Sequence, residues 1–202
     1  RLKKGFVDVV ERKMTPTEFY QYIARRADKE GTISRNEEGG LIYTPNDPNK
    51  IRLVVMDHMR KGLLEKGMTS EKEMIDSMSG KMVELKNILS WHFVTLIHMG
   101  RGAGEIARLK MMGERMYPTK DGIKGSGNPL EDATCVITIF NPNEDAYALT
   151  KHFGLEIRKS NGDPIYPNRR TAHVVAGRNN GGQAHCAFEF RGDLKHLKKF
   201  VK

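Results

Sequence analysis

The stretch Ile51-Arg-Leu-Val-Val-Met-Asp57-His58 decides the fold class of this chain. It is a short apolar run of strand-forming residues that ends in polar groups, and Trp91-His-Phe-Val-Thr-Leu-Ile-His98-Met-Gly-Arg101 is a second such run. Between them Ser70-Glu-Lys-Glu73 forms a capping box. Apolar residues follow this box at helical spacing: Met74, Ile75, Met78, Met82, Leu85 and Leu89. Strand, helix and strand predict a parallel α/β fold, which binds ligands at the carboxyl ends of its strands.

The composition bounds the chain to one core, or to one domain with long loops, in 202 residues. Its 34 Lys and Arg against 25 Asp and Glu give a net charge of +9, which favours a polyanionic partner such as nucleic acid. Charge alone also fits a merely soluble protein. Cys135 and Cys186 lie in apolar strand-like runs, so we expect buried, reduced thiols in the cytosol. No apolar run approaches the roughly 20 residues that span a bilayer, and no signal peptide is visible.

The remaining elements can be placed from local signals. Gly5–Val10 is a predicted strand, and Thr15-Pro-Thr-Glu18 is a strong helix start, from which the helix should run to about Lys29. Gly31–Asn49 is a predicted loop or small hairpin, and residues 100–130 form a long basic surface segment with one short helix. Residues 133–140 are predicted to be a buried strand, and further strands are predicted at 155–159, 171–176 and 184–190. The first half is thus α/β and the second mostly β.

Asp57 closes the first apolar run, and His98 closes the second. An Asp in this place commonly just caps the next turn, whereas in an ATPase with a phosphate-binding loop it holds Mg²⁺ through water. Because both residues end neighbouring strands, we expect His98 to lie beside Asp57 at the carboxyl edge of the sheet. There His98 is either a solvent-facing polar residue or a sensor of the γ-phosphate or of an attacking water.

The phosphate-binding loop that would accompany such an Asp is absent from the sequence. Gly100-Arg-Gly-Ala-Gly104 follows a predicted strand, but Glu105 stands where G-x-G-x-x-G needs its third glycine. No G-x-x-x-x-G-K-[ST] motif occurs, and Gly80-Lys81 is followed by Met82 within the predicted helix. If Asp57 holds Mg²⁺ rather than capping the next turn, the sequence lacks the phosphate cradle that would accompany it.

Two basic, glycine-bearing segments are the candidate contacts to polyanions. Lys124-Gly-Ser-Gly127, flanked by Lys110, Arg115 and Lys120, is either a solvated loop or one that tracks a nucleic-acid strand. Arg178-Asn-Asn-Gly-Gly182 is a predicted tight turn, where Arg178 is either merely exposed or an arginine finger for a neighbouring subunit's nucleotide. Nearby His and Cys residues lack zinc-site spacing, so we expect no metal there: His173, His185, Cys186 and His196.

Taken together and in order, these pieces resemble the RecA-type motor domain of DnaB-type replicative helicases, from about Lys3 to Phe200. Before its Walker B strand, the family has a strand and an "L-T-P-T-E" helix, which are similar to Phe6-Val-Asp-Val, Met14-Thr-Pro-Thr-Glu-Phe and Ala24-Arg-Arg. The Walker B strand itself resembles Leu53-Val-Val-Met-Asp57-His58. Phe93-Val-Thr-Leu-Ile-His98-Met-Gly-Arg101 is similar to the strand ending in "S-Q-L-N-R". Lys124-Gly-Ser-Gly-Asn-Pro-Leu-Glu-Asp-Ala133 resembles the loop that grips single-stranded DNA, and Ala176-Gly-Arg178-Asn-Asn-Gly-Gly the hairpin with the trans-acting arginine.

The chain departs from the family pattern at several places. His98 stands where the family usually has Gln, and Ala176 or Gly177 stands where its hairpin has Lys. Residues 143–170 are longer than the family leads us to expect, which predicts an inserted hairpin. The family's Walker A loop and catalytic Glu precede the point that corresponds to the start of this sequence. Since the sequence begins Arg-Leu-Lys-Lys without Met, we expect a piece of a longer protein.

The resemblance implies a RecA-like P-loop NTPase core with a mainly parallel sheet, helices on its faces and β-hairpins in the C-terminal half. It implies an α/β core at 1–100, a basic DNA-binding loop at 101–132 and a β-rich part at 133–202. The implied site residues are catalytic Asp57, His98 and Arg178, of which Asp57 and Arg178 bind the cofactor. The implied DNA contacts are Lys120, Lys124, Gly125, Ser126 and Gly127.

The implied activity is ATP- and Mg²⁺-dependent 5′–3′ unwinding by a homohexamer on single-stranded DNA, with a primase and a helicase loader as further partners and no membrane. The expected location is the cytoplasm, at the nucleoid or replisome, and a viral protein in a bacterial host also fits. Two alternatives stay open: a non-hydrolysing RecA-like protein that binds single-stranded DNA or regulates a helicase, and a recombinase or loader of the same superfamily.

Overall fold

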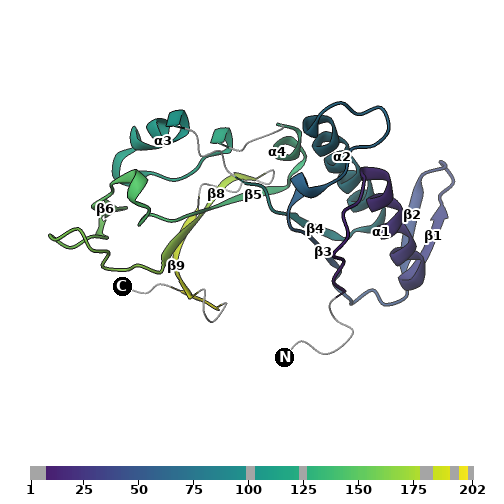
Figure 1. The fold of residues 1–202 in the computed structure, drawn as a ribbon. Helices are drawn as coiled ribbons and strands as arrows, with labels where there is room; N and C mark the ends of the chain where they lie inside the picture. Colours follow the sequence, from purple (N-terminus) through teal and green to yellow (C-terminus); the bar gives the residue numbers. More distant parts are fainter. Residues whose placement is uncertain (1–7, 99–102, 123–126, 178–183, 192–195, 200–202) are drawn as a thin grey trace. The chain divides into compact units, whose positions relative to one another are not determined.

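The computed structural model describes residues 8–98, 103–122, 127–177, 184–191 and 196–199 (Figure 1). The chain divides into two compact units, Arg1–Ile97 and His98–Lys202, called unit 1 and unit 2 below. Among the described residues, no helix combines the length and the apolar character that crossing a bilayer requires.

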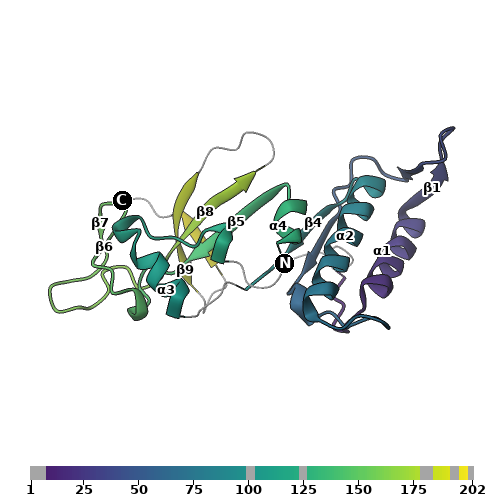
Figure 2. The same ribbon diagram turned by 90° about the horizontal axis from the view of Figure 1, so that it is seen from above.

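Two helices form one layer of unit 1 and lie side by side (Figure 2). Helix α1 spans Pro16–Glu30, and its N-cap Thr15 and Glu18 make the reciprocal hydrogen bonds of a capping box. Helix α2 spans Glu71–Leu89, and the Ser70 side chain accepts a hydrogen bond from the Glu73 N–H. The start of α1 confirms the prediction, because it depends on neighbouring residues alone. Helix α2 begins where it was predicted, but the predicted capping box is only half present: the Glu73 carboxylate accepts hydrogen bonds from the Thr69 N–H and hydroxyl instead of the Ser70 N–H.

The predicted strand–helix–strand unit is present in unit 1. Strand β3, Leu53–Met56, pairs in parallel with β4, His92–Thr95, and α2 connects them. One face of this pair packs on the two helices through Val54, Met56 and Phe93. The helices contribute buried side chains to the same core, including the predicted methionines: Phe19, Ile23, Ala27, Met74, Ile75, Met78, Met82, Leu85 and Leu89. An antiparallel hairpin of β1, Gly31–Arg35, and β2, Leu41–Pro45, occupies the stretch predicted as a loop or hairpin.

Unit 2 is built on a four-stranded antiparallel sheet of order β10-β9-β8-β5. The strands are β5, Cys135–Phe140; β8, Arg169–Gly177; β9, His185–Arg191; and β10, His196–Lys199. Its other elements are helices α3, Ala103–Lys110, and α4, Asn128–Asp132, and the short hairpin of β6, Lys151–His152, and β7, Leu155–Glu156. A small core joins the sheet to these elements through Leu109, Met116, Phe140, Leu149 and Ile157.

The expected parallel sheet is present only in part: within the described ranges β3 and β4 pair in parallel, and the other sheets are small and antiparallel. The expectations for residues 8–10 and for the two cysteines are wrong. Residues 8–10 of the expected strand Gly5–Val10 have no regular structure, and the rest of it lies outside the described residues. Strand β5 is buried on one face alone, and both cysteines are exposed. Cys135 lies on the exposed face of β5, where exposed and more buried residues alternate along the strand. Cys186 pairs with Ala172, which in turn pairs with Ile139 of β5, so Cys186 lies on the same exposed face.

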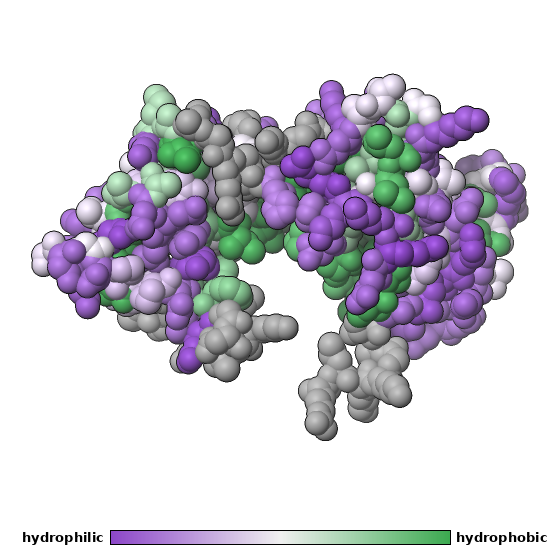
Figure 3. Space-filling view, viewed as in Figure 1, coloured by the Kyte–Doolittle hydropathy of each residue, from purple (hydrophilic) through white to green (hydrophobic). Residues whose placement is uncertain are grey.

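Each unit therefore leaves one apolar sheet face exposed. On β3 and β4 this face is formed by Leu53, Val55, Val94 and Leu96, each 45–58% exposed. On β5 it is formed by Ile137 and Ile139, which are 60% and 66% exposed. Figure 3 shows hydrophobic colour gathered over these strands within a mostly hydrophilic surface. Parallel pairs are normally covered on both faces, so the bare face of β3 and β4 is unusual for an α/β unit.

Candidate functional site

Asp57 lies directly after β3, at the carboxyl end of the parallel pair, and is exposed. The backbone around it continues the pairing with the chain beyond β4. The Leu96 N–H donates to Met56 O at 3.0 Å, and the Met59 N–H donates to Leu96 O at 3.3 Å. The Asp57–His58 peptide bond is cis. Asp57 thus lies at a strand end whose backbone is hydrogen-bonded to Leu96 both before and after it. This strand end is the position predicted for Asp57.

The loop behind Asp57 is fixed to the start of α2. Met59 is 1% exposed within the core of unit 1. The Arg60 guanidinium donates two hydrogen bonds to the Glu71 carboxylate, at 2.5 and 2.7 Å. Bidentate pairs of this kind fix direction as well as distance. No local sequence pattern predicts this contact, because the partners lie eleven residues apart on different elements.

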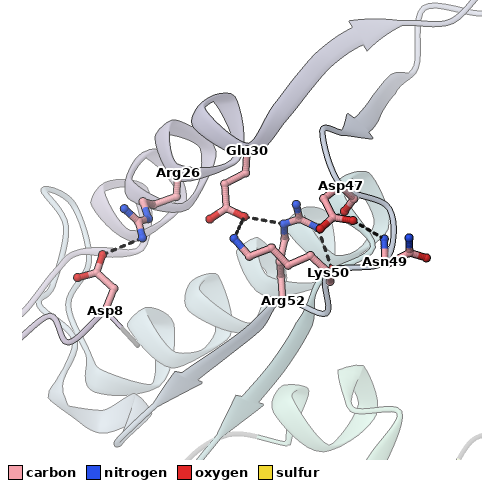
Figure 4. Close-up of polar contacts among 7 residues, drawn as sticks. All are labelled: Asp8, Arg26, Glu30, Asp47, Asn49, Lys50 and Arg52. Atoms are coloured by element: carbon pink, nitrogen blue, oxygen red, sulfur yellow. Dashed lines mark hydrogen bonds and ion pairs between the residues drawn. The ribbon is translucent and has the colours of Figure 1, made fainter. Parts of the chain in front are cut away.

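The start of β3 is held by a second polar cluster (Figure 4). Glu30, at the end of α1, accepts hydrogen bonds of 2.8 Å from Lys50 Nζ and Arg52 Nε. The Arg52 side chain is 9% exposed and lies over the Trp91 ring, 6.0 Å from the ring centroid. Partial burial alone would raise the pKa of Glu30, but the two cationic donors outweigh it and hold this pKa below its ordinary value. The cluster joins the end of α1 to the start of β3, the strand that Asp57 follows.

Asp57 fits a role as a partial magnesium ligand. In the described part of the chain, no three His, Cys, Asp or Glu side chains lie together as a metal site. Magnesium in nucleotide sites typically takes one or two carboxylates and completes its shell with phosphate oxygens and water. A single exposed carboxylate at a strand end meets that requirement, whereas it could not hold the ion alone.

His98 is exposed, is the first residue of unit 2, and follows β4 by three positions. Its expected place beside Asp57 stays a prediction.

The candidate DNA contacts are described in part. Lys120 is exposed and opens a short 3-10 helix, Lys120–Gly122. Gly127 is exposed and directly precedes α4, and a Cβ atom there would meet nothing within 4 Å. Open space around Gly127 leaves room for a ligand to approach its backbone. Lys124, Gly125 and Ser126 lie outside the described residues.

Arg178 also lies outside the described residues. Strand β8 ends at Gly177, immediately before it, and the antiparallel β9 begins at His185. The expected insertion at 143–170 contains a hairpin, β6 and β7, together with an isolated bridge between Arg158 and Pro164.

Comparison with solved structures finds 41 chains of related fold, among them two from helicases. One is the structure of a DnaB-like replicative helicase and its interactions with primase, with a TM-score of 0.61 and 12% identity over 96% of this chain and 36% of that one. The other is the ATPase domain of G40P, with a TM-score of 0.59 and 12% identity over 94% of this chain and 52% of that one. No family model matches the sequence, and no curated protein is significantly similar to it. The chain thus spans about a third to a half of these proteins and shares the fold of a DnaB-like helicase ATPase domain.

Proposed function

We propose that this chain is part of the ATP-driven motor of a replicative DNA helicase that acts as a ring on single-stranded DNA. The observation that carries the proposal is Asp57, an exposed carboxylate at the carboxyl end of a parallel strand, in a chain with the fold of such a motor. In α/β sheets of this kind, ligands bind at that edge. The excess of basic residues, with a net charge of +9, supports a polyanionic track.

In this proposal Asp57 would hold Mg²⁺ through water, and a metal bound there would supply positive charge at the phosphates of ATP. His98 senses the γ-phosphate or the attacking water by hydrogen bonding. Lys120 and the segment from Lys124 to Gly127 hold the DNA backbone through charge and backbone N–H groups, which requires no base sequence. Arg178 completes the site of an adjacent subunit, and so the active species is an oligomer, a hexamer by analogy with the family.

The proposal also covers partners and place. The DnaB-like neighbour was solved for its interactions with primase, and we extend a primase contact to this chain as part of the proposal. A helicase loader, a replisome location and 5′–3′ movement follow from the same analogy. Each of them depends on the helicase reading of the fold.

The test is Mg²⁺-dependent ATP hydrolysis by the native polypeptide, stimulated by single-stranded DNA. Asp57→Asn should lower turnover by about a hundredfold or more, since contact with the metal is worth several kcal/mol in the transition state. Asp28→Asn, which removes an exposed carboxylate from α1 in the same unit, is the matched control and should leave turnover unchanged. Equal turnover in the Asp57→Asn variant and the native protein would refute the magnesium role.

A second candidate is a non-hydrolysing RecA-like protein that binds single-stranded DNA or regulates a helicase ring. If the native chain starts near Arg1, the observation that favours this candidate is the absence of any G-x-x-x-x-G-K-[ST] motif in the sequence. The intact mass of the native polypeptide separates the two candidates. A mass well above 22.9 kDa supports a motor with its phosphate loop elsewhere in the chain, and a mass equal to it supports the non-hydrolysing protein. A recombinase of the same superfamily would instead coat DNA as filaments and show no preference for forked duplexes.

A further inference from the structure

The β6–β7 hairpin of unit 2 docks on the inner face of the antiparallel sheet through two aromatic side chains. Phe153 and Gly154, both with positive φ of 49° and 72°, form the two-residue turn of the hairpin. The Phe153 ring stacks on His185 of β9 with the ring centroids 4.5 Å apart. The preceding residue, His152, is fully buried and lies 4.8 Å from the Phe153 ring and 5.5 Å from the Phe140 ring. The hairpin is thus held by a histidine.

His152 is bound in a way that suits only the neutral imidazole. Its Nε2 lies 2.8 Å from the Met116 carbonyl oxygen, which can only accept, so Nε2 carries the proton. Its Nδ1 is buried and has no hydrogen-bond partner among the described residues. A second proton would therefore place a charged N–H without an acceptor inside the core, and burial of an unpaired charge is strongly unfavourable.

The neighbours of His152 add to this cost because they are basic groups, none of which can offset a positive charge on the imidazole. His173 on β8 is 3% exposed, and its ring lies 6.4 Å from His152. Arg169, also on β8, is 5% exposed, and its charge acts on His152 together with that of His185 on β9. From the segment after helix α3, Tyr117 stacks on His173 at 4.4 Å, while Glu114 is exposed and contributes its backbone carbonyl to the Phe153 N–H. His173 Nε2 and Thr171 Oγ1 lie 2.9 Å apart.

We propose that His152 and His173 form an acid-operated latch, whose protonation releases the β6–β7 hairpin from the sheet of unit 2. The proposal is independent of the proposed function, because it concerns the internal stability of unit 2. The released state would expose Phe140, Phe153 and the sheet face beneath them. Release of the hairpin would remove its contacts with β8 and β9, the strands that precede and follow residues 178–183.

The direction of the pH effect follows from linkage. Burial is the largest cause that lowers the pKa of both His152 and His173 from 6.5 to about 4. For His173 the neighbouring imidazoles of His152 and His185 are the next cause. The open state then binds more protons than the closed one between pH 4 and 6.5, so closure is fully favoured above that window and is lost as the pH falls through it. Between about pH 7 and pH 5, the opening constant should rise about twentyfold for each imidazole and about 500-fold for both.

The test is hydrogen exchange of the full chain, read by mass spectrometry on peptides that cover residues 149–157 and corrected for intrinsic exchange rates at each pH. His152→Gln retains an N–H donor for Met116 O but cannot titrate, so its opening constant should rise about twentyfold instead of about 500-fold over the same pH range. His92→Gln, at an exposed histidine of β4, is the matched control and should behave as the native chain. The single tryptophan, Trp91, lies in unit 1 and should keep its emission while the hairpin opens.

A rise of less than about fivefold in the native chain, or an equal rise in the His152→Gln variant, would overturn the latch. So would a loss of Trp91 emission at the same pH, since this would mean general acid unfolding. If His152→Gln does not fold at neutral pH, the native chain alone decides. The logarithm of its opening constant should change with a slope approaching two protons per pH unit within the window, and a slope below about one would refute the latch.

Discussion

The substitution Gly31→Ala should push the start of β1 away from β2. Gly31 is the first residue of β1, and its φ of 178° is extended backbone that any residue adopts, so the obstacle is space alone. A Cβ atom there would lie 2.4 Å from the Thr44 backbone oxygen and 2.6 Å from the Tyr43 ring. An ordinary contact begins near 3.4 Å, so the two strands must move apart by roughly 3.4 − 2.4 = 1.0 Å.

A rotamer change cannot relieve this clash, because one of the two groups is backbone. Overpacking of this kind typically costs about 1–3 kcal/mol. The shift also disturbs Tyr43, which is 9% exposed and packs edge-on against Trp91 at 6.2 Å. We therefore expect a loss near the upper end, about 3 kcal/mol in the free energy of unfolding of unit 1.

The assay is urea denaturation followed by fluorescence of Trp91, which is the single tryptophan of the chain and lies in the core of unit 1. Gly80→Ala is the matched control, because Gly80 is exposed within α2 and a Cβ atom there meets nothing within 4 Å. That variant should be more stable by about 0.5–1 kcal/mol, since Ala loses less backbone freedom in a helix than Gly. If Gly31→Ala were as stable as the native chain, the close approach of β1 to β2 at this point would be refuted.

Three further changes test the polar contacts and the proposed roles. Glu30→Gln should destabilise unit 1 by about 2 kcal/mol at neutral pH. Because the pKa of Glu30 is lowered in the folded chain, this loss of stability should shrink as the pH falls through that pKa. Urea denaturation at neutral and at acidic pH measures the loss, and an equal loss at both would refute the pairing of Glu30 with Lys50 and Arg52. In a complete ring, Arg178→Ala should abolish ATP hydrolysis and leave ATP binding largely intact, and equal loss of both would remove its role as a finger in trans. Lys124→Ala should weaken binding to single-stranded DNA and reduce the slope of log affinity against log salt by about one contact, so an unchanged slope would take this segment off the DNA path.

The sequence predicts the local features of this fold well. The start of α1 depends on Thr15, Pro16 and Glu18, which are neighbours in the chain, and the structure has the predicted capping box. The methionines of α2 follow a helical period, and Met74, Met78 and Met82 are buried as expected. Patterns of this kind are readable because the interacting residues lie within one turn of each other.

Features that depend on long-range packing could not be predicted. Cys135 lies in an apolar run that reads as buried, but the structure leaves one face of β5 uncovered, and no local pattern tells which face this is. Glu30 and Arg52 are 22 residues apart, and Arg60 and Glu71 are eleven, so their pairing follows only from the tertiary contacts of α1 with the start of β3 and of the loop after Asp57 with α2. The position of Asp57 at the end of β3 could be predicted because a strand end is a local signal, whereas the contacts that support this loop are not local.

The bare face of β3 and β4 also bears on the heat capacity of unit 1. Leu53, Val55, Val94 and Leu96 are hydrated in the folded chain as well as in the unfolded one. Apolar surface that stays hydrated adds nothing to the heat-capacity change of unfolding, which is about 12–15 cal/mol/K per residue in ordinary globular domains. Unit 1 should therefore fall below that range and have a flatter curve of stability against temperature. Any partner or further segment that covers this face would raise the heat-capacity change and make the curve steeper.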